Sequence, residues 1–270
     1  MDTPITLARL RAGERVSYVP ERGLRDFDLV LSYTGGAALD ELERSLGARN
    51  ARPLYGHVDP DVHHPVPSCE RCCERYRADL SYLGTYAADR QAALERLFVA
   101  PARCRPQLKF LIGGAQYPPD FPWTANVYFV QHVPPSEHAP FFSSSRLTLN
   151  VTRAAMAEMG WCPSGRLFEA SACGAALLSD AWAGLEDFYQ PGAEILLAED
   201  TADALSALDI ADEQLERIRR AARERTLDEH TCHPRARMLT NRLESSERSR
   251  YSQRTSLFAA SGAARSGTKN

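Results

Sequence analysis

Strand-like and helix-like segments alternate along most of this chain of 270 residues, and this alternation restricts its fold more than any other feature. Short apolar runs of strand length recur between stretches whose apolar residues repeat at helical spacing. Such βαβ units cross over with a right hand, which places their strands side by side in a mostly parallel sheet. The sequence therefore predicts an α/β fold whose ligands bind at the carboxyl ends of the strands.

The pattern can be divided into segments. The strands expected in the main sheet are 79–83, 108–112, 126–130, 146–150, 175–179 and 194–197, and the clearest helices are 89–98, 166–173 and 213–227. Nearer the N-terminus we expect strands at 28–33 and 53–58. Between these two, Leu39, Leu42 and Leu46 lie at helical spacing and Gly47 stands where a helix would end.

Composition divides the chain into four parts. The stretch DPDVHHPVPS, rich in proline, predicts a linker over 59–78, which separates an N-terminal part at 1–58 from a larger domain at 79–244. The last segment, 245–270, has seven serines and five positive charges against one negative charge. It is expected to be a disordered tail.

Charge and hydropathy exclude several classes of protein. The 32 basic and 35 acidic residues give a net charge of −3, which argues against a protein that coats nucleic acid or an anionic membrane. No apolar stretch approaches the ~20 residues of a membrane-spanning helix. The first residues, MDTPITLARLRAGERV, lack the apolar core of a signal peptide, so a cytoplasmic location is expected, with the seven cysteines reduced.

Gly84 and Thr85 form the first candidate ligand-binding loop. They follow the strand at 79–83 and precede a helix, where backbone amides and the helix N-terminus favour an anionic group. A single glycine in such a turn is also compatible with a purely structural role. The fingerprint G-x-G-x-x-G is absent from the sequence, which disfavours a reductase that uses a dinucleotide.

The segment CPSGRLFEASACGAALLSD carries a second candidate site. Arg166 and Glu169 are three residues apart, hence on one face near the start of a helix. A guanidinium there can bind a phosphate and a carboxylate can accept both hydroxyls of a ribose. An ordinary surface ion pair explains the same spacing equally well.

A metal site is not predicted. Cys69, Cys72 and Cys73 lie close in sequence to His63 and His64, but no second cysteine pair or matching histidine pair follows downstream. The cluster also falls in the expected linker.

Several segments taken together resemble a known family. DLSYLGTYAADRQ, SSSRLTLNVTR, CPSGRLFEASACGAALLSDAWAGLEDFYQPGAEILLA and ERTLDEHTCHPRA are similar, in this order, to successive blocks of the CgeB-like (spore maturation protein type) glycosyltransferases of the GT-B group. GHVDPDVHHP resembles the crossover between the two domains of that group. The resemblance implies a GT-B-like fold, in which two Rossmann-like domains face each other across a cleft.

The resemblance also implies roles for individual residues. Glu169 would bind the ribose of a nucleotide-sugar, Arg166 would lie towards its diphosphate, and the loop Gly84-Thr85 would approach the same diphosphate. Trp161 stands where many retaining relatives carry a second glutamate. The lower-ranked candidates at loop ends along the cleft are His132, Asn150 and Arg153.

We therefore expect a glycosyltransferase that moves a sugar from a nucleotide-diphosphate sugar to an unknown acceptor, without a metal or other cofactor. The alternative is a nucleotide-sugar-binding module without turnover, because residues 1–58 suffice only for the remnant of a second Rossmann-like domain. Nucleic acid is not expected as a partner.

Overall fold

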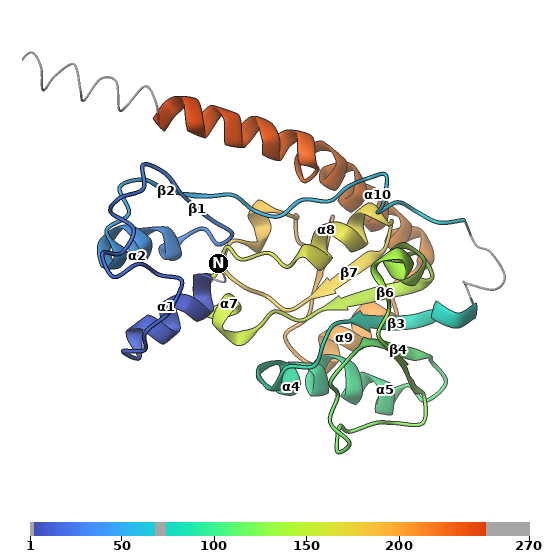
Figure 1. Ribbon diagram of the computed structural model, residues 1–270. Coiled ribbons are helices and arrows are strands. Elements are labelled where there is room, and N and C mark those ends of the chain that lie inside the picture. Colours follow the sequence, from blue (N-terminus) through green and yellow to red (C-terminus); the bar gives the residue numbers. More distant parts are fainter. Residues whose placement is uncertain (1–2, 68–73, 247–270) are drawn as a thin grey trace, which may run out of the picture.

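A six-stranded parallel sheet forms the centre of the protein (Figure 1). The computed structural model describes residues 3–67 and 74–246. The sheet has the order β5-β4-β3-β6-β7-β8, and every neighbouring pair in it is parallel. Its strands are β3 (Ala78–Leu83), β4 (Phe110–Gly114), β5 (Val127–Gln131), β6 (Ser145–Asn150), β7 (Ala176–Ser179) and β8 (Leu196–Leu197). The predicted α/β fold with a parallel sheet is thus confirmed.

The order of the strands creates a switch point between β3 and β6. From β3 the chain moves outward to β4 and β5, and then returns to place β6 against the other side of β3, where Leu80 pairs with Leu147. The connections therefore leave this pair in opposite directions, which opens a crevice at the carboxyl ends of the two strands.

Helices cover both faces of the sheet (Figure 1). On one face, Leu80, Phe98, Phe110 and Leu147 belong to a buried apolar cluster, and on the other face Phe168 belongs to a second one. Burying each such side chain contributes about 1.5–3 kcal/mol. The helices are η1 (Ala88–Arg90), α4 (Gln91–Leu94), η2 (Glu95–Val99), α5 (Ala100–Cys104) and α9 (Thr201–Leu208) on the first face, and α6 (His138–Ser143), α8 (Gly165–Ala172) and α10 (Asp212–Glu229) mainly on the second.

A smaller unit precedes the large sheet. It contains α1 (Thr3–Arg11), β1 (Val30–Ser32), α2 (Ala37–Leu46) and β2 (Ala51–Pro53), with β1 and β2 parallel. Gly47 ends α2 in the left-handed conformation (φ 73°), as the sequence predicts. Leu7, Val30 and Leu42 are among the residues that form its own small core.

Some expected boundaries are wrong. The strand expected at 53–58 lies earlier, because β2 ends at Pro53 and only an isolated bridge from Val58 to Thr231 follows. The helix expected at 89–98 is a composite of 3-10, α and π turns that continues to Cys104. Further helices were not foreseen, among them α1, α6, α9, η3 (Pro135–Glu137), α7 (Ala154–Met159) and η4 (Leu185–Asp187).

Near its C-terminal end the chain returns to the smaller unit. After α10, residues 232–246 form another helix, which passes along that unit (Figure 1). The expected tail lies, from residue 247 on, outside the described residues. In the described part of the chain, no helix has the length and apolar character needed to cross a membrane.

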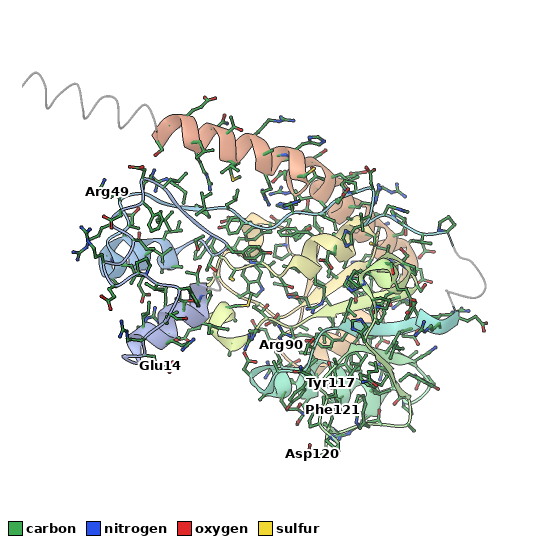
Figure 2. All side chains as sticks on the ribbon, in the orientation of Figure 1. Glu14, Arg49, Arg90, Tyr117, Asp120 and Phe121 are labelled. Atoms are coloured by element: carbon green, nitrogen blue, oxygen red, sulfur yellow. The ribbon has the colours of Figure 1, made fainter. Side chains whose placement is uncertain are left out.

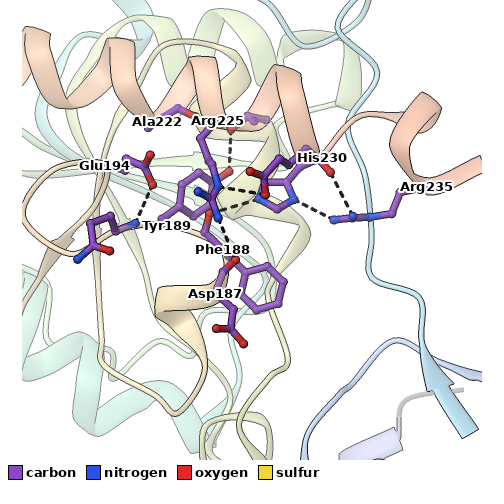
Figure 3. Close-up of polar contacts among 11 residues, drawn as sticks. Asp187, Phe188, Tyr189, Glu194, Ala222, Arg225, His230 and Arg235 are labelled. Atoms are coloured by element: carbon purple, nitrogen blue, oxygen red, sulfur yellow. Dashed lines mark hydrogen bonds and ion pairs between the residues drawn. The ribbon is translucent and has the colours of Figure 1, made fainter. Parts of the chain in front are cut away.

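His230 holds this return segment in place (Figure 3). The ring is 3% exposed and its Nδ1 lies 2.9 Å from a guanidinium nitrogen of Arg235. Because arginine only donates hydrogen bonds, Nδ1 accepts, and Nε2 carries the proton that it donates to the carbonyl of Phe188. Arg235 also donates to the carbonyl of Gly56, and the amide of Val58 donates to the carbonyl of His230. The neutral imidazole and the backbone of His230 thus join three segments: residues 56–58, the segment at Phe188 and the helix that carries Arg235.

Burial lowers the pKa of His230 to about 4, and the positive charges of Arg235 and Arg225 act in the same direction. The unfolded chain has the higher pKa and so binds more protons between about pH 4 and 6.5. We predict that this group lowers the free energy of unfolding by roughly 3 kcal/mol as the pH falls through that window, and that it contributes no pH dependence above it.

Urea unfolding of the wild type and of His230→Gln at pH 7.5, 5.5 and 4.5 tests this prediction. Glutamine offers one donor and one acceptor but does not titrate, so the variant should lose less stability on acidification than the wild type does. Equal losses in the two proteins would contradict the assignment.

Candidate functional site

A cavity of about 290 Å³ lies at the carboxyl ends of β3 and β4, beside the switch point. Five of the seven residues predicted from the sequence meet in its wall, namely Gly84, Thr85, His132, Arg166 and Glu169. The other lining residues are Leu83, Gly114, Ala115, Val133, His138 and Ser164.

The start of α8 forms one wall of this cavity. Ser164 caps the helix, since its hydroxyl accepts a hydrogen bond from the amide of Arg166. The guanidinium of Arg166 lies over the ring of Tyr82, 5.1 Å from its centroid, and donates to Oδ1 of Asn150 at 3.3 Å. Burial lowers the pKa of Arg166, yet arginine stays protonated in proteins.

Arg166 has no carboxylate partner at ion-pair distance within the described part of the chain. Withdrawing a charge from water costs several kcal/mol unless an opposite charge compensates. The helix N-terminus beside it adds further positive potential. The cavity therefore favours an anionic ligand.

The loop after β3 forms the opposite wall. A Cβ atom at Gly84 would lie 2.8 Å from the hydroxyl of Tyr82 and 2.9 Å from Nη2 of Arg166. A Cβ atom at Gly114 would lie only 2.0 Å from the carbonyl oxygen of Gly84. These two glycines allow the loops after β3 and β4 to approach each other and Arg166.

His132 has an unusual backbone conformation. Its φ of 52° is in the left-handed region, and its amide donates to the carbonyl of Gly114 at 2.7 Å. Such a conformation costs of order 1–3 kcal/mol in a residue other than glycine. It keeps His132 in the wall of the cavity.

Asn150 and Arg153 do not line the cavity. Asn150 is fully buried and lies beneath Arg166, where its amide nitrogen donates to the hydroxyl of Ser179. Arg153 instead pairs with Asp89 at 3.4 Å. Asn150 thus positions Arg166, and a direct role for either residue in ligand binding stays a prediction.

Sequence reasoning missed Arg90, which Figure 2 labels near the start of α4. Its Nη1 donates to the hydroxyl of Tyr82 at 3.3 Å and to the carbonyl of Thr85 at 3.4 Å, and its Nε is buried without a hydrogen-bond partner. A cation at a helix start opposes the helix dipole, and this unfavourable position could have drawn attention to it. Arg90 adds a second guanidinium beside Tyr82.

Sequence reasoning also missed His138, whose Nδ1 lies 3.5 Å from Oε2 of Glu169. Burial opposes ionisation of Glu169, but the hydrogen bond from His138 and the charges of His63, His138 and Arg166 together lower its pKa below the ordinary value. Glu169 is therefore a carboxylate at neutral pH. A histidine far from the α8 motif in sequence gave no signal of this contact.

Trp161 connects the large domain to the smaller unit. Its indole nitrogen donates to Asp187 at 2.7 Å, and its carbonyl accepts from the amide of Gly35 at 2.9 Å. A Cβ atom at Gly36 or Gly184 would approach its ring to about 2.5 Å or less. Trp161, which the resemblance places where many retaining relatives carry a second glutamate, thus has a packing role.

The strand order defines a doubly wound α/β domain, and the candidate cavity lies beside its switch point. The family described as glycosyl transferase-like matches residues 90–241, more than half of the chain, and the chain belongs to this family. Among curated proteins, none matches the sequence significantly.

Solved glycosyltransferase structures share the fold. Sucrose-phosphate synthase from Thermosynechococcus elongatus has 18% identity and a TM-score of 0.63, and the match covers 88% of this chain and 60% of that one. HepE of Anabaena in complex with UDP-glucose has 13% identity and a TM-score of 0.65, with 82% and 65% covered.

A third structure corresponds to part of the present chain only. The C-terminal domain of the group 1 glycosyltransferase LpcC from Francisella tularensis has 11% identity and a TM-score of 0.50, with 65% of this chain and 99% of that one covered. The chain spans 60% and 65% of the lengths of the first two structures. These similarities confirm the GT-B-like fold.

We predict that the packing of the Trp161 indole requires a glycine at position 184. In Gly184→Ala the new Cβ would lie 2.4 Å from the indole, in addition to the strain of a φ of 86°. We expect a loss of roughly 2–5 kcal/mol, the sum of about 1–2 for the backbone and about 1–3 for overpacking. Gly192→Ala is the matched control, because Gly192 has a φ of 79° but nothing within 4 Å of the new Cβ.

Urea unfolding of both variants measures the difference. Gly192→Ala should lose only the backbone contribution. Equal destabilisation of the two variants would show that the contact with Trp161 does not matter.

Proposed function

We propose that the cavity binds the nucleotide-diphosphate part of a sugar donor, and that the protein transfers the sugar to an acceptor. The observation that carries the proposal is the guanidinium of Arg166, which faces the cavity at a helix N-terminus without a carboxylate partner among the described residues. Membership in a glycosyl transferase-like family supports the same reaction class. The ordered resemblance to CgeB-like enzymes supports that subgroup.

The chemistry of glycosyl transfer fits this arrangement. Departure of the nucleotide builds negative charge on the leaving phosphate, and donors fixed in advance stabilise such charge most effectively. In our proposal Arg166, the α8 N-terminus and the loop at Gly84 and Thr85 supply this stabilisation. Arg90 adds positive potential from behind Tyr82.

Glu169 would bind the ribose. It follows Arg166 by three residues and lines the same cavity, so a diphosphate on Arg166 places the adjoining ribose within reach of the carboxylate. An ionised carboxylate can accept hydrogen bonds from both hydroxyls of the diol. HepE, which shares the fold, is described in complex with UDP-glucose, and we extend a nucleotide-sugar donor to this chain on that basis.

A nucleotide-sugar-binding module without turnover is the second candidate. Among the described residues, the smaller unit has a sheet of two strands, β1 and β2, whereas the sheet beside the cavity has six. Donor binding and turnover must therefore be measured separately.

We predict that Arg166→Met and Glu169→Gln each weaken the binding of UDP or another nucleoside diphosphate by about 10- to 150-fold. The reason is that hydrogen bonds to charged groups contribute roughly 1.5–3 kcal/mol each. Calorimetric titration with UDP, GDP and ADP and their glucose conjugates measures the change. Arg103→Met, which removes an exposed arginine on α5 that does not line the cavity, is the control.

Unchanged affinity in both cavity variants would overturn the site. Release of free sugar from the tightest-binding donor, followed by mass spectrometry, separates the two candidate functions. Binding without any release, with or without candidate acceptors, would favour the module.

A further inference from the structure

Two histidines and a glutamate from three separate segments meet beside the cavity. His63 comes from the connection between the two units, His138 begins α6, and Glu169 lies in α8. One ligand atom from each lies within 4.8 Å of the other two, and all three residues are half-buried. Within residues 3–67 and 74–246, no other group of three such residues reaches this proximity.

The distances suit a tetrahedral metal ion. Zinc binds imidazole nitrogen at about 2.0–2.1 Å and carboxylate oxygen at about 2.0–2.2 Å, which separates two tetrahedral donors by roughly 3.3 Å. His138 Nδ1 and Glu169 Oε2 already lie 3.5 Å apart. Only His63 has to move closer, by about 1.5 Å at most on the same geometry.

The backbone holds His63 towards this position from both sides. On one side, the amides of Val62 and His63 donate to the carbonyl of Asp59 in a tight turn. On the other side, the amide of Val66 donates to the hydroxyl of Ser143, at the end of α6. Ser143 in turn donates to the carbonyl of Cys173, just after α8, so the connection is fastened to both helices that carry the other two ligands.

One ring nitrogen of His63 lacks the hydrogen-bond partner that a buried polar atom needs. Nδ1 is buried and makes no hydrogen bond. A buried polar atom without a hydrogen-bond partner destabilises the folded protein. Metal binding to the imidazole, with His63 free to turn about its side-chain bonds, would remove this cost.

We propose that His63, His138 and Glu169 bind a divalent metal ion of the zinc class. Two imidazoles and one carboxylate favour zinc, cobalt or nickel, whereas magnesium and calcium prefer oxygen ligands. The ion would fasten the connection between the two units to α6 and α8. It would also leave one tetrahedral position for water or a ligand in the neighbouring cavity.

The bound metal has a consequence for the donor site, and this consequence rests on the proposed function. A carboxylate oxygen of Glu169 that coordinates zinc no longer accepts a hydrogen bond from the ribose in the same geometry. Zinc and UDP should therefore compete, so that zinc raises the apparent dissociation constant of UDP.

Cobalt serves as the spectroscopic probe, because it replaces zinc in such sites and absorbs visible light strongly when tetrahedral. The metal-free full-length protein should bind one equivalent of Co²⁺ with a tetrahedral spectrum, which zinc then displaces. His63→Ala and His138→Ala should each weaken binding by more than about tenfold, because even the loss of an outer-shell partner costs 10- to 100-fold. His64→Ala, next to His63 but outside the group, should bind as the wild type does.

The cysteines at positions 69, 72 and 73 provide a rival set of ligands, and their triple replacement by serine distinguishes it. Binding that survives this change and is lost in His63→Ala supports the proposal. Absence of cobalt binding, equal binding by wild type and His63→Ala, or a sulfur charge-transfer band that disappears with the cysteines would overturn it. If His138→Ala does not fold, His63→Ala decides alone, since it alters a segment outside the helices and strands.

A UDP titration with and without zinc then tests the competition. If cobalt binds as described but UDP binds nowhere, the metal site stands and the proposed function fails. If UDP binds and cobalt does not, the proposed function stands and the metal site fails.

Discussion

The pairing of β3 with β6 is the constraint on which the rest of the structure depends. Because the chain leaves this pair in opposite directions, no crossover helix closes the carboxyl end of the sheet there. At this open carboxyl end, the start of α8 lies on one side of the cavity and the loop after β3 lies on the other. The candidate cavity at this place is thus a product of topology, and its side chains determine which kind of ligand would suit it.

The polar groups around Tyr82 bear on the charge of a ligand that the cavity would accept. Two guanidiniums, of Arg90 and Arg166, contact the same tyrosine, and their like charges disfavour each other. Asn150 supports Arg166 with a neutral oxygen instead of a carboxylate, so the positive charge is positioned without being neutralised. A fold that needed only stability would gain more from an apolar group or an ion pair here. The arrangement is consistent with an anion that arrives from solution.

Local signals in the sequence explain which features could be predicted. The apolar runs of β3 and β6, the helix at Gly165–Ala172 and the glycine that ends α2 all depend on nearby residues, and they were found. The strand expected at 53–58 failed because Tyr55 and Val58 pack in the apolar cluster of the large domain, and the backbone of Val58 bridges to Thr231 and not to the small sheet. Burial alone does not distinguish those two environments.

The same reasoning explains why the group around Glu169 was missed. The helix motif indicated a role for Glu169, but the two histidines come close to it only in the folded chain. The return of β6 to β3 brings His138 near, and the hydrogen bonds of Ser143 hold the connection that carries His63. His63, in the connection between the two units, therefore has a ring nitrogen within 4.8 Å of the carboxylate proposed to bind the donor ribose. Whatever binds Glu169, metal or nucleotide, changes the interactions available to His63. In our two proposals, the connection to the smaller unit and the occupancy of the donor site are therefore coupled through the carboxylate of Glu169.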